Sequence, residues 1–284
     1  MKKRAVSVML TAAMVSAMLA GCGSKNAETQ SAADTTAESA ASGDETSADT
    51  QAADAETTDA ETTDASKTDG TFTVGFDQDF PPMGFVGDDG EFTGFDLEMA
   101  AEVAKRLNLM IAYQPIAWDA KDMELDAGTI DCIWNGFTMN GREDDYEWSK
   151  PYMKNNQVFV VRGDSDINSE ADLAGKNVEV QTDSSAEAAL NDNSELTSTF
   201  GSLTPVAGYN TAFMDLESGA VDAIAMDDVV ASYQITSRKA DFKVLDDVIA
   251  AEEYGIGFKK GNTGLRDKVQ ATLEEMAADG TAAK

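Results

Sequence analysis

The sequence contains no histidine among its 284 residues, and this absence limits the chemistry that the protein can perform. Histidine is the commonest general acid–base group and the commonest metal ligand near neutral pH. Positive charge is also scarce, because 21 Lys and Arg residues stand against 52 Asp and Glu residues, a net charge of −31. A chain this acidic repels nucleic acid and anionic lipid surfaces. We therefore expect no nucleic acid partner and no metal or other cofactor.

A long hydrophobic run is also missing, and the apolar stretch that exists lies at the N-terminus. Positive residues at Lys2–Arg4 precede the apolar segment Ala5–Ala20, which is followed by "LAGC" at Leu19–Cys22. That segment is shorter than the roughly 20 residues that span a bilayer. Its arrangement is that of a secretory signal, and "LAGC" resembles a bacterial lipoprotein signal. We expect residues 1–22 to be removed as a signal peptide and Cys22 to carry lipid.

Residues 23–70 lack Val, Ile, Leu, Met and every aromatic residue. The segment consists mainly of Ala, Thr, Ser, Asp and Glu, with a short repeat in "DAETTDAETTDASKT". Such a composition cannot bury enough apolar surface to offset the entropy of ordering the chain. We expect a disordered acidic tether that holds the protein, through its lipid, at the extracytoplasmic face of the cell membrane.

The remaining 71–284 segment alternates between patterns typical of strands and helices. Phe72, Val74 and Phe76 fall on one face of a strand, and helical spacing follows over residues 97–107. Cys132 is the only cysteine of this part, so we exclude an internal disulfide and expect a buried small side chain. Alternating strands and helices predict an α/β fold with largely parallel sheets. The length allows one large domain or two lobes of about 100 residues each.

One phrase occurs twice in the folded part. "MELDAGTIDCI" at Met123–Ile133 and "MDLESGAVDAI" at Met214–Ile224 each read as a short helix, a glycine that ends it, and an apolar strand. The repeat predicts two similar lobes, each with its own sheet. Because ligands of open α/β sheets bind beyond the carboxyl ends of strands, the residues after each copy should face a cleft. "WNGFTMNGR" offers a cation and a hydroxyl, and "AMDD" offers carboxylates, so a zwitterion would fit between them.

Five stretches, in this order, resemble the extracytoplasmic substrate-binding proteins of polar amino-acid ABC importers, solute-binding protein family 3. They are "VGFDQDFPPMGF", "GEFTGFDLEMAAEVAKRL", "LDAGTIDCI", "VDAIAMDD" and "EEYGIGFKKGN…LRDKV", and the resemblance covers essentially all of residues 72–280. It implies a two-lobed periplasmic-binding-protein-like fold that closes over a free amino acid. Lobe 1 would comprise 71–155 with 253–284 and lobe 2 would comprise 156–252. Hinge strands would lie near Tyr152–Gln157 and Ala250–Tyr254.

The resemblance also implies binding roles for residues of the first lobe. Asp77 and Phe80 would line the pocket for the ligand's side chain, and Trp118 would sandwich the ligand with Phe80. On composition alone, both aromatic residues would more often belong to a core than to a pocket. Asp77 could instead cap a turn.

The groups common to all amino acids would be bound from both lobes. Gly136 and Thr138 would hydrogen-bond the α-amino and α-carboxylate groups, and Arg142 would pair with the α-carboxylate. The family usually has one more residue between this Thr and Arg, and a surface ion pair with Glu143 or Asp144 is the alternative for Arg142. From the second lobe, the predicted residues are Gln181, Ser184 and Ser185, which line the pocket, and Asp227, which anchors the α-ammonium; Asp228 would cap the next helix.

The sequence therefore predicts a binding protein that delivers an amino acid to the permease subunits of an ABC transporter and acts as a monomer. Asp77 and Gln181, with no Lys or Arg in these motifs, favour glutamine, cystine or a basic amino acid over glutamate. Two alternatives stay open: a dehydratase of cyclic precursors of aromatic amino acids, which shares this fold, and an amino-acid-sensing ectodomain. The missing histidine and the tether disfavour the dehydratase. The chain stops at "ADGTAAK", where relatives usually continue into another helix.

Overall fold

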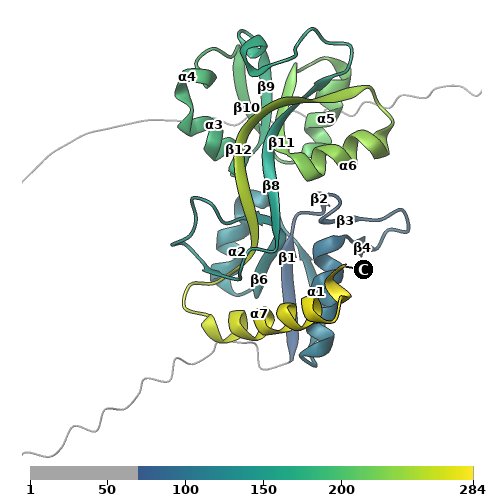
Figure 1. Cartoon of the computed structure of the whole chain (residues 1–284), viewed down its shortest axis with the longest axis vertical. Coiled ribbons are helices and arrows are strands. Elements are labelled where there is room, and N and C mark those ends of the chain that lie inside the picture. Colours follow the sequence, from purple (N-terminus) through teal and green to yellow (C-terminus); the bar gives the residue numbers. More distant parts are fainter. Residues whose placement is uncertain (1–69, 284) are drawn as a thin grey trace, which may run out of the picture. The chain divides into compact units, whose positions relative to one another are not determined.

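Strands and helices alternate along the computed structural model, which describes residues 70–283 (Figure 1). The predictions for the signal peptide, for Cys22 and for the tether up to residue 69 lie outside these residues. No helix in the described range is both long and apolar enough to cross a bilayer. The elements are β1 (Thr71–Phe76), β2 (Asp79–Phe80), β3 (Gly84–Val86), β4 (Phe92–Thr93), α1 (Phe95–Arg106), β5 (Met110–Pro115), η1 (Trp118–Ala120), α2 (Lys121–Ala127), β6 (Cys132–Thr138), β7 (Glu147–Trp148), β8 (Met153–Arg162), η2 (Glu170–Leu173), β9 (Asn177–Gln181), α3 (Ser185–Asp192), α4 (Ser194–Thr197), β10 (Ser202–Val206), α5 (Tyr209–Ser218), β11 (Ala223–Asp227), α6 (Asp228–Arg238), β12 (Phe242–Phe258), α7 (Thr263–Ala278) and η3 (Thr281–Ala283).

Two groups of parallel strands share one hydrogen-bonded sheet. Its order is β10-β9-β11-β8-β12-β6-β1-β5, with β7 paired to β12, and β2, β3 and β4 form a separate small sheet. In the first lobe β1 pairs in parallel with β5 and β6, and in the second lobe β9 pairs in parallel with β10 and β11. The predicted α/β fold with mostly parallel strands within each lobe is confirmed.

The strands β8 and β12 connect the two lobes, and they lie side by side as long antiparallel neighbours (Figure 1). The sequence pattern predicts two strands, "KVLDDV" and "YGIGFKK", where the structure has the single 17-residue strand β12. Asp246 and Asp247 do not interrupt β12, because register shifts between Val244 and Val248 absorb the irregularity. The two sheets are therefore continuous rather than separate, and both segments named as hinges lie mainly in β8 and β12.

Helix α1 shows how the first lobe is packed. Leu97, Ala100 and Val103 are buried on one face, as the helical spacing predicts. This face packs into a core with β1 and with apolar residues of α7, the C-terminal helix that lies beside it (Figure 1). Cys132 is fully buried in the same core, so the prediction of a buried small side chain is confirmed.

The repeated phrase forms equivalent elements in the two lobes. Helix α2 ends at Gly128 with φ 73°, and α5 ends at Gly219 with φ 78°, both in the left-handed region that favours glycine. The buried strands β6 and β11 follow. The predicted order of helix, glycine and strand is confirmed, and it brings the residues after each copy to the ends of the two central strands.

Candidate functional site

One cavity gathers nine of the ten residues that the sequence marks as ligand-binding. Its free space is about 10 Å³, roughly the room of a single water molecule. An amino acid therefore enters only if the walls of the cavity move apart. The lining residues are Phe80, Trp118, Gly136, Thr138, Arg142, Gln181, Ser184, Ser185 and Asp227.

Asp77 is the tenth residue and lies directly behind this lining. Its carboxylate accepts hydrogen bonds from Gln181 Nε2 at 2.6 Å and from the backbone N of Asp79 at 2.8 Å. Burial raises the pKa of Asp77 above its usual range. Because Asp77 follows β1 and Gln181 ends β9, this hydrogen bond joins the two lobes.

The two aromatic residues are buried and each packs against another ring. Phe80 lies 6.0 Å from Tyr209 between ring centroids, and Trp118 packs edge-on against Phe137 at 5.5 Å. Both residues contribute to the small core clusters and to the cavity wall. The core and the pocket interpretations therefore apply to the same side chains.

Gly136 is held in place by Asp96, a residue in the first turn of α1. The backbone N of Gly136 donates to Asp96 Oδ2 at 2.6 Å, and the Tyr152 hydroxyl donates to the same oxygen at 2.8 Å. Gly136 has φ 59°, and a Cβ there would meet Phe80 at 2.9 Å. Asp96 is fully buried, and burial raises its pKa to about 7. No sequence motif separates this aspartate from an ordinary residue of a first helical turn.

The hydroxyl groups at the cavity divide into two roles. Thr138 Oγ1 donates to Ser185 Oγ at 3.2 Å, a contact between the lobes, and Gln157 Nε2 donates to the same serine at 2.9 Å. Ser184 caps α3, since its hydroxyl accepts from the backbone N of Glu187 at 3.1 Å. Its side chain is thus engaged within the second lobe.

Arg142 extends along the cavity rather than toward its neighbours in sequence. The guanidinium donates to the backbone oxygens of Thr138 at 3.3 Å and Asp183 at 3.4 Å, and lies 5.4 Å above the ring of Phe137. Neither Glu143 nor Asp144 is among its contacts, although both lie in the described range. The tight turn after Thr138 thus brings the guanidinium to the cavity despite the short spacing.

Asp227 ends β11, and its carboxylate turns toward the two connecting strands. Oδ1 accepts from Tyr254 OH at 2.6 Å, Gln157 Nε2 at 2.8 Å and Asn155 Nδ2 at 3.0 Å. The assignment of the helix cap to Asp228 is wrong. Asp227 is the N-cap residue of α6, with a side chain that makes no cap bond, and Asp228 is already helical, its carboxylate 3.4 Å from Ser232 Oγ. The backbone of Asp227 is extended, so its side chain points to β8 instead.

A second carboxylate, Glu252 of β12, completes this group. Its Oε1 accepts from Asn155 Nδ2 at 2.7 Å and from Gln157 Nε2 at 2.8 Å, and the residue is buried. Burial, and then the charge of Glu252, raise the pKa of Asp227 well above its usual range. Sequence reasoning missed this role because it depends on the pairing of β8 with β12, in which Asn155 lies opposite Glu252.

The sequence model of the bacterial extracellular solute-binding proteins, family 3, matches residues 72–284. The chain belongs to this family. It is 32% identical over 217 residues to the L-cystine-binding protein TcyJ of Escherichia coli (strain K12), covering 74% of this chain and 79% of that protein. It is 31% identical to the L-cystine-binding protein TcyA of Bacillus subtilis (strain 168), covering 75% and 78%.

Solved structures agree with the family. The crystal structure of an ABC uptake transporter substrate-binding protein from Streptococcus pneumoniae with bound histidine superposes with a TM-score of 0.72 at 33% identity, covering 74% of this chain and 88% of that one. Family 3 members are solute-binding proteins and not enzymes, which removes the dehydratase alternative.

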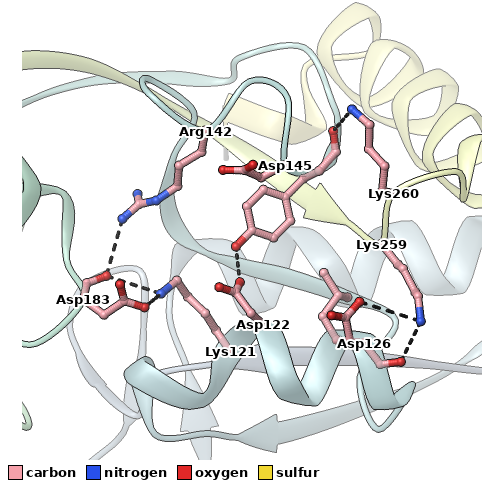
Figure 2. Close-up of a pocket in the computed structure, with 10 residues that line it drawn as sticks. Lys121, Asp122, Asp126, Arg142, Asp145, Asp183, Lys259 and Lys260 are labelled. Atoms are coloured by element: carbon pink, nitrogen blue, oxygen red, sulfur yellow. Dashed lines mark hydrogen bonds and ion pairs between the residues drawn. The ribbon is translucent and has the colours of Figure 1, made fainter.

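In this family 3 protein, a further contact between the lobes lines a separate pocket that shares Arg142 with the cavity (Figure 2). Lys121 of α2 and Arg142 both reach Asp183, which directly precedes the cavity residues Ser184 and Ser185. Lys121 Nζ forms an ion pair with the Asp183 carboxylate and lies 3.3 Å from its backbone oxygen. The Lys121 side chain is only 2% exposed, so the lysine of this ion pair is almost completely shielded from solvent.

Replacing Lys121 with methionine is expected to weaken ligand binding about tenfold through faster dissociation, without changing which ligand is preferred. The reason is that Lys121 does not line the cavity itself but contacts its wall at Trp118 and pairs with Asp183 across the lobes. A charge-assisted contact of this kind contributes about 1.4 kcal/mol. Stopped-flow dissociation kinetics would measure the change.

Lys259→Met is the matched control for this prediction. Lys259 lines the pocket of Figure 2 together with Lys121 but pairs with Asp126 inside the first lobe, so its loss should leave the dissociation rate unchanged. An equal effect of both substitutions, or an altered ligand preference in Lys121→Met, would contradict a role in holding the lobes together.

Proposed function

We propose that this protein binds a free polar amino acid outside the cell membrane and delivers it to an ABC permease. The observation that carries the proposal is the distribution of charge around one narrow cavity. Asp227 contributes a carboxylate from the second lobe, and Arg142 contributes a guanidinium from the first. The two opposite charges suit the ammonium and carboxylate groups that every free amino acid carries.

Capture would proceed by closure of the two lobes around β8 and β12. The hydrogen bonds between Asp77 and Gln181 and between Thr138 and Ser185 join the lobes at the cavity. A ligand bound between them would add contacts to both lobes at once, and would favour the state in which the lobes meet. For the lobes we propose the boundaries 71–155 with 253–284, and 156–252, and we propose that the protein acts as a monomer.

For the ligand we propose glutamine, cystine or a basic amino acid in preference to glutamate. Gln181 lines the cavity with its amide, and the Asp77 carboxylate lies behind it and accepts a hydrogen bond from Gln181 Nε2. An acidic side chain would meet the negative charge of Asp77 without a cation to offset it. The two L-cystine-binding relatives and the histidine-bound structure support a polar or basic ligand.

Isothermal titration calorimetry of the full chain against the free amino acids tests this function. We expect binding of at least one member of the set glutamine, cystine, arginine, lysine and histidine, and much weaker binding of glutamate. Failure of every free amino acid to bind would refute the function. Tighter binding of glutamate than of this set would refute the assignment of the side-chain pocket.

We also propose that lipid on Cys22 anchors the protein, supported by "LAGC" and by the acidic stretch that follows it. Cys22→Ser is expected to move the protein from the membrane fraction to the soluble extracytoplasmic fraction, because serine lacks the thiol to which the lipid would be attached. Immunoblotting of the two fractions would show the change. Substitution of Ser24, two residues away, serves as the control and should leave the protein in the membrane fraction.

A further inference from the structure

Two buried carboxylates share the same two hydrogen-bond donors at the edge of the cavity. Asn155 Nδ2 lies 3.0 Å from Asp227 Oδ1 and 2.7 Å from Glu252 Oε1. Gln157 Nε2 lies 2.8 Å from each of the same two oxygens. The two acids are thus held close together, Asp227 at 3% exposure and Glu252 at 5%.

In the part of the chain that the structure describes, no cation forms an ion pair with either acid. Tyr254 donates to Asp227 from β12, and the buried Tyr209 of α5 adds a neutral phenol. Arg142 is the cation of the cavity lining, and its hydrogen bonds go to Thr138 and Asp183.

Two like charges that share donors out of water cannot both be ionised at low cost. One solution is that the pair keeps a proton, and the other is that a cation joins it. A ligand ammonium group would supply the cation together with three N–H donors. Besides the two carboxylates, Gln157 Oε1 is a buried acceptor without a partner in the described part of the chain. The cluster therefore contains three acceptor groups, of which Asp227 belongs to the cavity lining.

We propose that the Asp227–Glu252 pair holds one proton when the cavity is free of ligand, and that the ammonium group of the amino acid replaces this proton. The inference rests on the proposed function and concerns the same site. On binding, the carboxyl O–H bond breaks, its electron pair stays on the oxygen, and the proton leaves to the buffer. The ammonium N–H groups then donate to the carboxylates. The net charge is −1 both for the pair with its bound proton and for the pair with the ligand's ammonium group.

Calorimetry in buffers of different ionisation enthalpy tests the exchange. Glutamine, cystine and arginine are the probes, because their side chains do not titrate near pH 6. The observed binding enthalpy should change linearly with the ionisation enthalpy of the buffer, with a slope of about one proton released at pH 6. Affinity should rise by up to about tenfold per pH unit while the pair is still protonated.

Glu252→Gln is expected to bind the ligand more weakly and to lose this dependence on the buffer, because a single carboxylate no longer shares a site with a second one. Glu253→Gln is the matched control: its side chain alternates to the other face of β12 and is half-buried, so proton release should stay at the wild-type value.

The outcomes separate the exchange from the function. Binding without proton release in the wild type, or unchanged proton release in Glu252→Gln, would overturn the exchange and leave the function intact. No binding of any probe, nor of the other free amino acids, would overturn the function itself.

Discussion

Replacing Asp227 with alanine is expected to weaken the binding of every recognised amino acid by about 100-fold or more. Removing one partner of a buried, hydrogen-bonded charge pair costs about 2–5 kcal/mol, and 2.7 kcal/mol corresponds to about 100-fold in the dissociation constant. The loss should be similar for all ligands, because the ammonium group is common to them. Calorimetry on the ligands that bind the wild type would measure it.

The contrast with Asp77→Ala sharpens this prediction. Asp77 contacts Gln181 behind the end of the cavity that we assign to the ligand's side chain, so its loss should change the order of preference among amino acids. Asp228→Ala is the control next to Asp227 and should stay within about 0.5 kcal/mol of the wild type. Equal losses for all ligands in both Asp227→Ala and Asp77→Ala would refute the division of roles.

Asp96→Ala is expected to lower the free energy of unfolding by about 2–4 kcal/mol at pH 5. The substitution leaves the backbone N of Gly136 and the hydroxyl of Tyr152 without their acceptor, and each unsatisfied buried donor costs about 1–3 kcal/mol. Denaturant unfolding followed by fluorescence would measure the loss. Because Gly136 lines the cavity, ligand affinity should fall as well.

The pH dependence of the free energy of unfolding distinguishes the effect of the Asp96 charge from the effect of its hydrogen bonds. Its folded pKa of about 7 exceeds the ordinary aspartate pKa of 3.8, so the folded state holds the proton more firmly than the unfolded state. The contribution of Asp96 to stability is therefore greatest below about pH 3.8 and declines as the pH rises to 7.

Asp96→Asn keeps an acceptor and does not titrate. The free energy of unfolding of Asp96→Asn, relative to that of the wild type, should rise by up to about 4 kcal/mol between pH 4 and pH 7. One pKa unit corresponds to 1.36 kcal/mol. A difference between the two proteins that is constant over this pH range would rule out titration of Asp96.

Much of the fold and most of the cavity could be predicted from local patterns. The glycines Gly128 and Gly219 and the strands after them are marked by short stretches of sequence, and they position Thr138 and Asp227 at strand ends. The resemblance to the family then supplied the other lining residues. These features depend on residues close together in sequence or on motifs in a known order.

The unpredicted features depend on contacts between distant segments. Glu252 meets Asp227 only because β8 pairs with β12 in one register, and Lys121 meets Asp183 only where two lobes touch. Asp96 reads as an ordinary residue of a first helical turn, yet the fold buries it beneath Gly136. The sequence around a charged residue does not indicate which distant residue it will contact in the fold.

The connecting strands have a consequence for how such a protein could be adapted. Asn155 and Gln157 belong to β8, and Glu252 and Tyr254 belong to β12. The strands that we propose to bend therefore also surround the ammonium site that we propose. A sensor designer who stiffens or loosens these strands will alter the affinity at the same time. On our proposal, selectivity can be retuned separately at Asp77, which follows β1, and at Gln181, which ends β9.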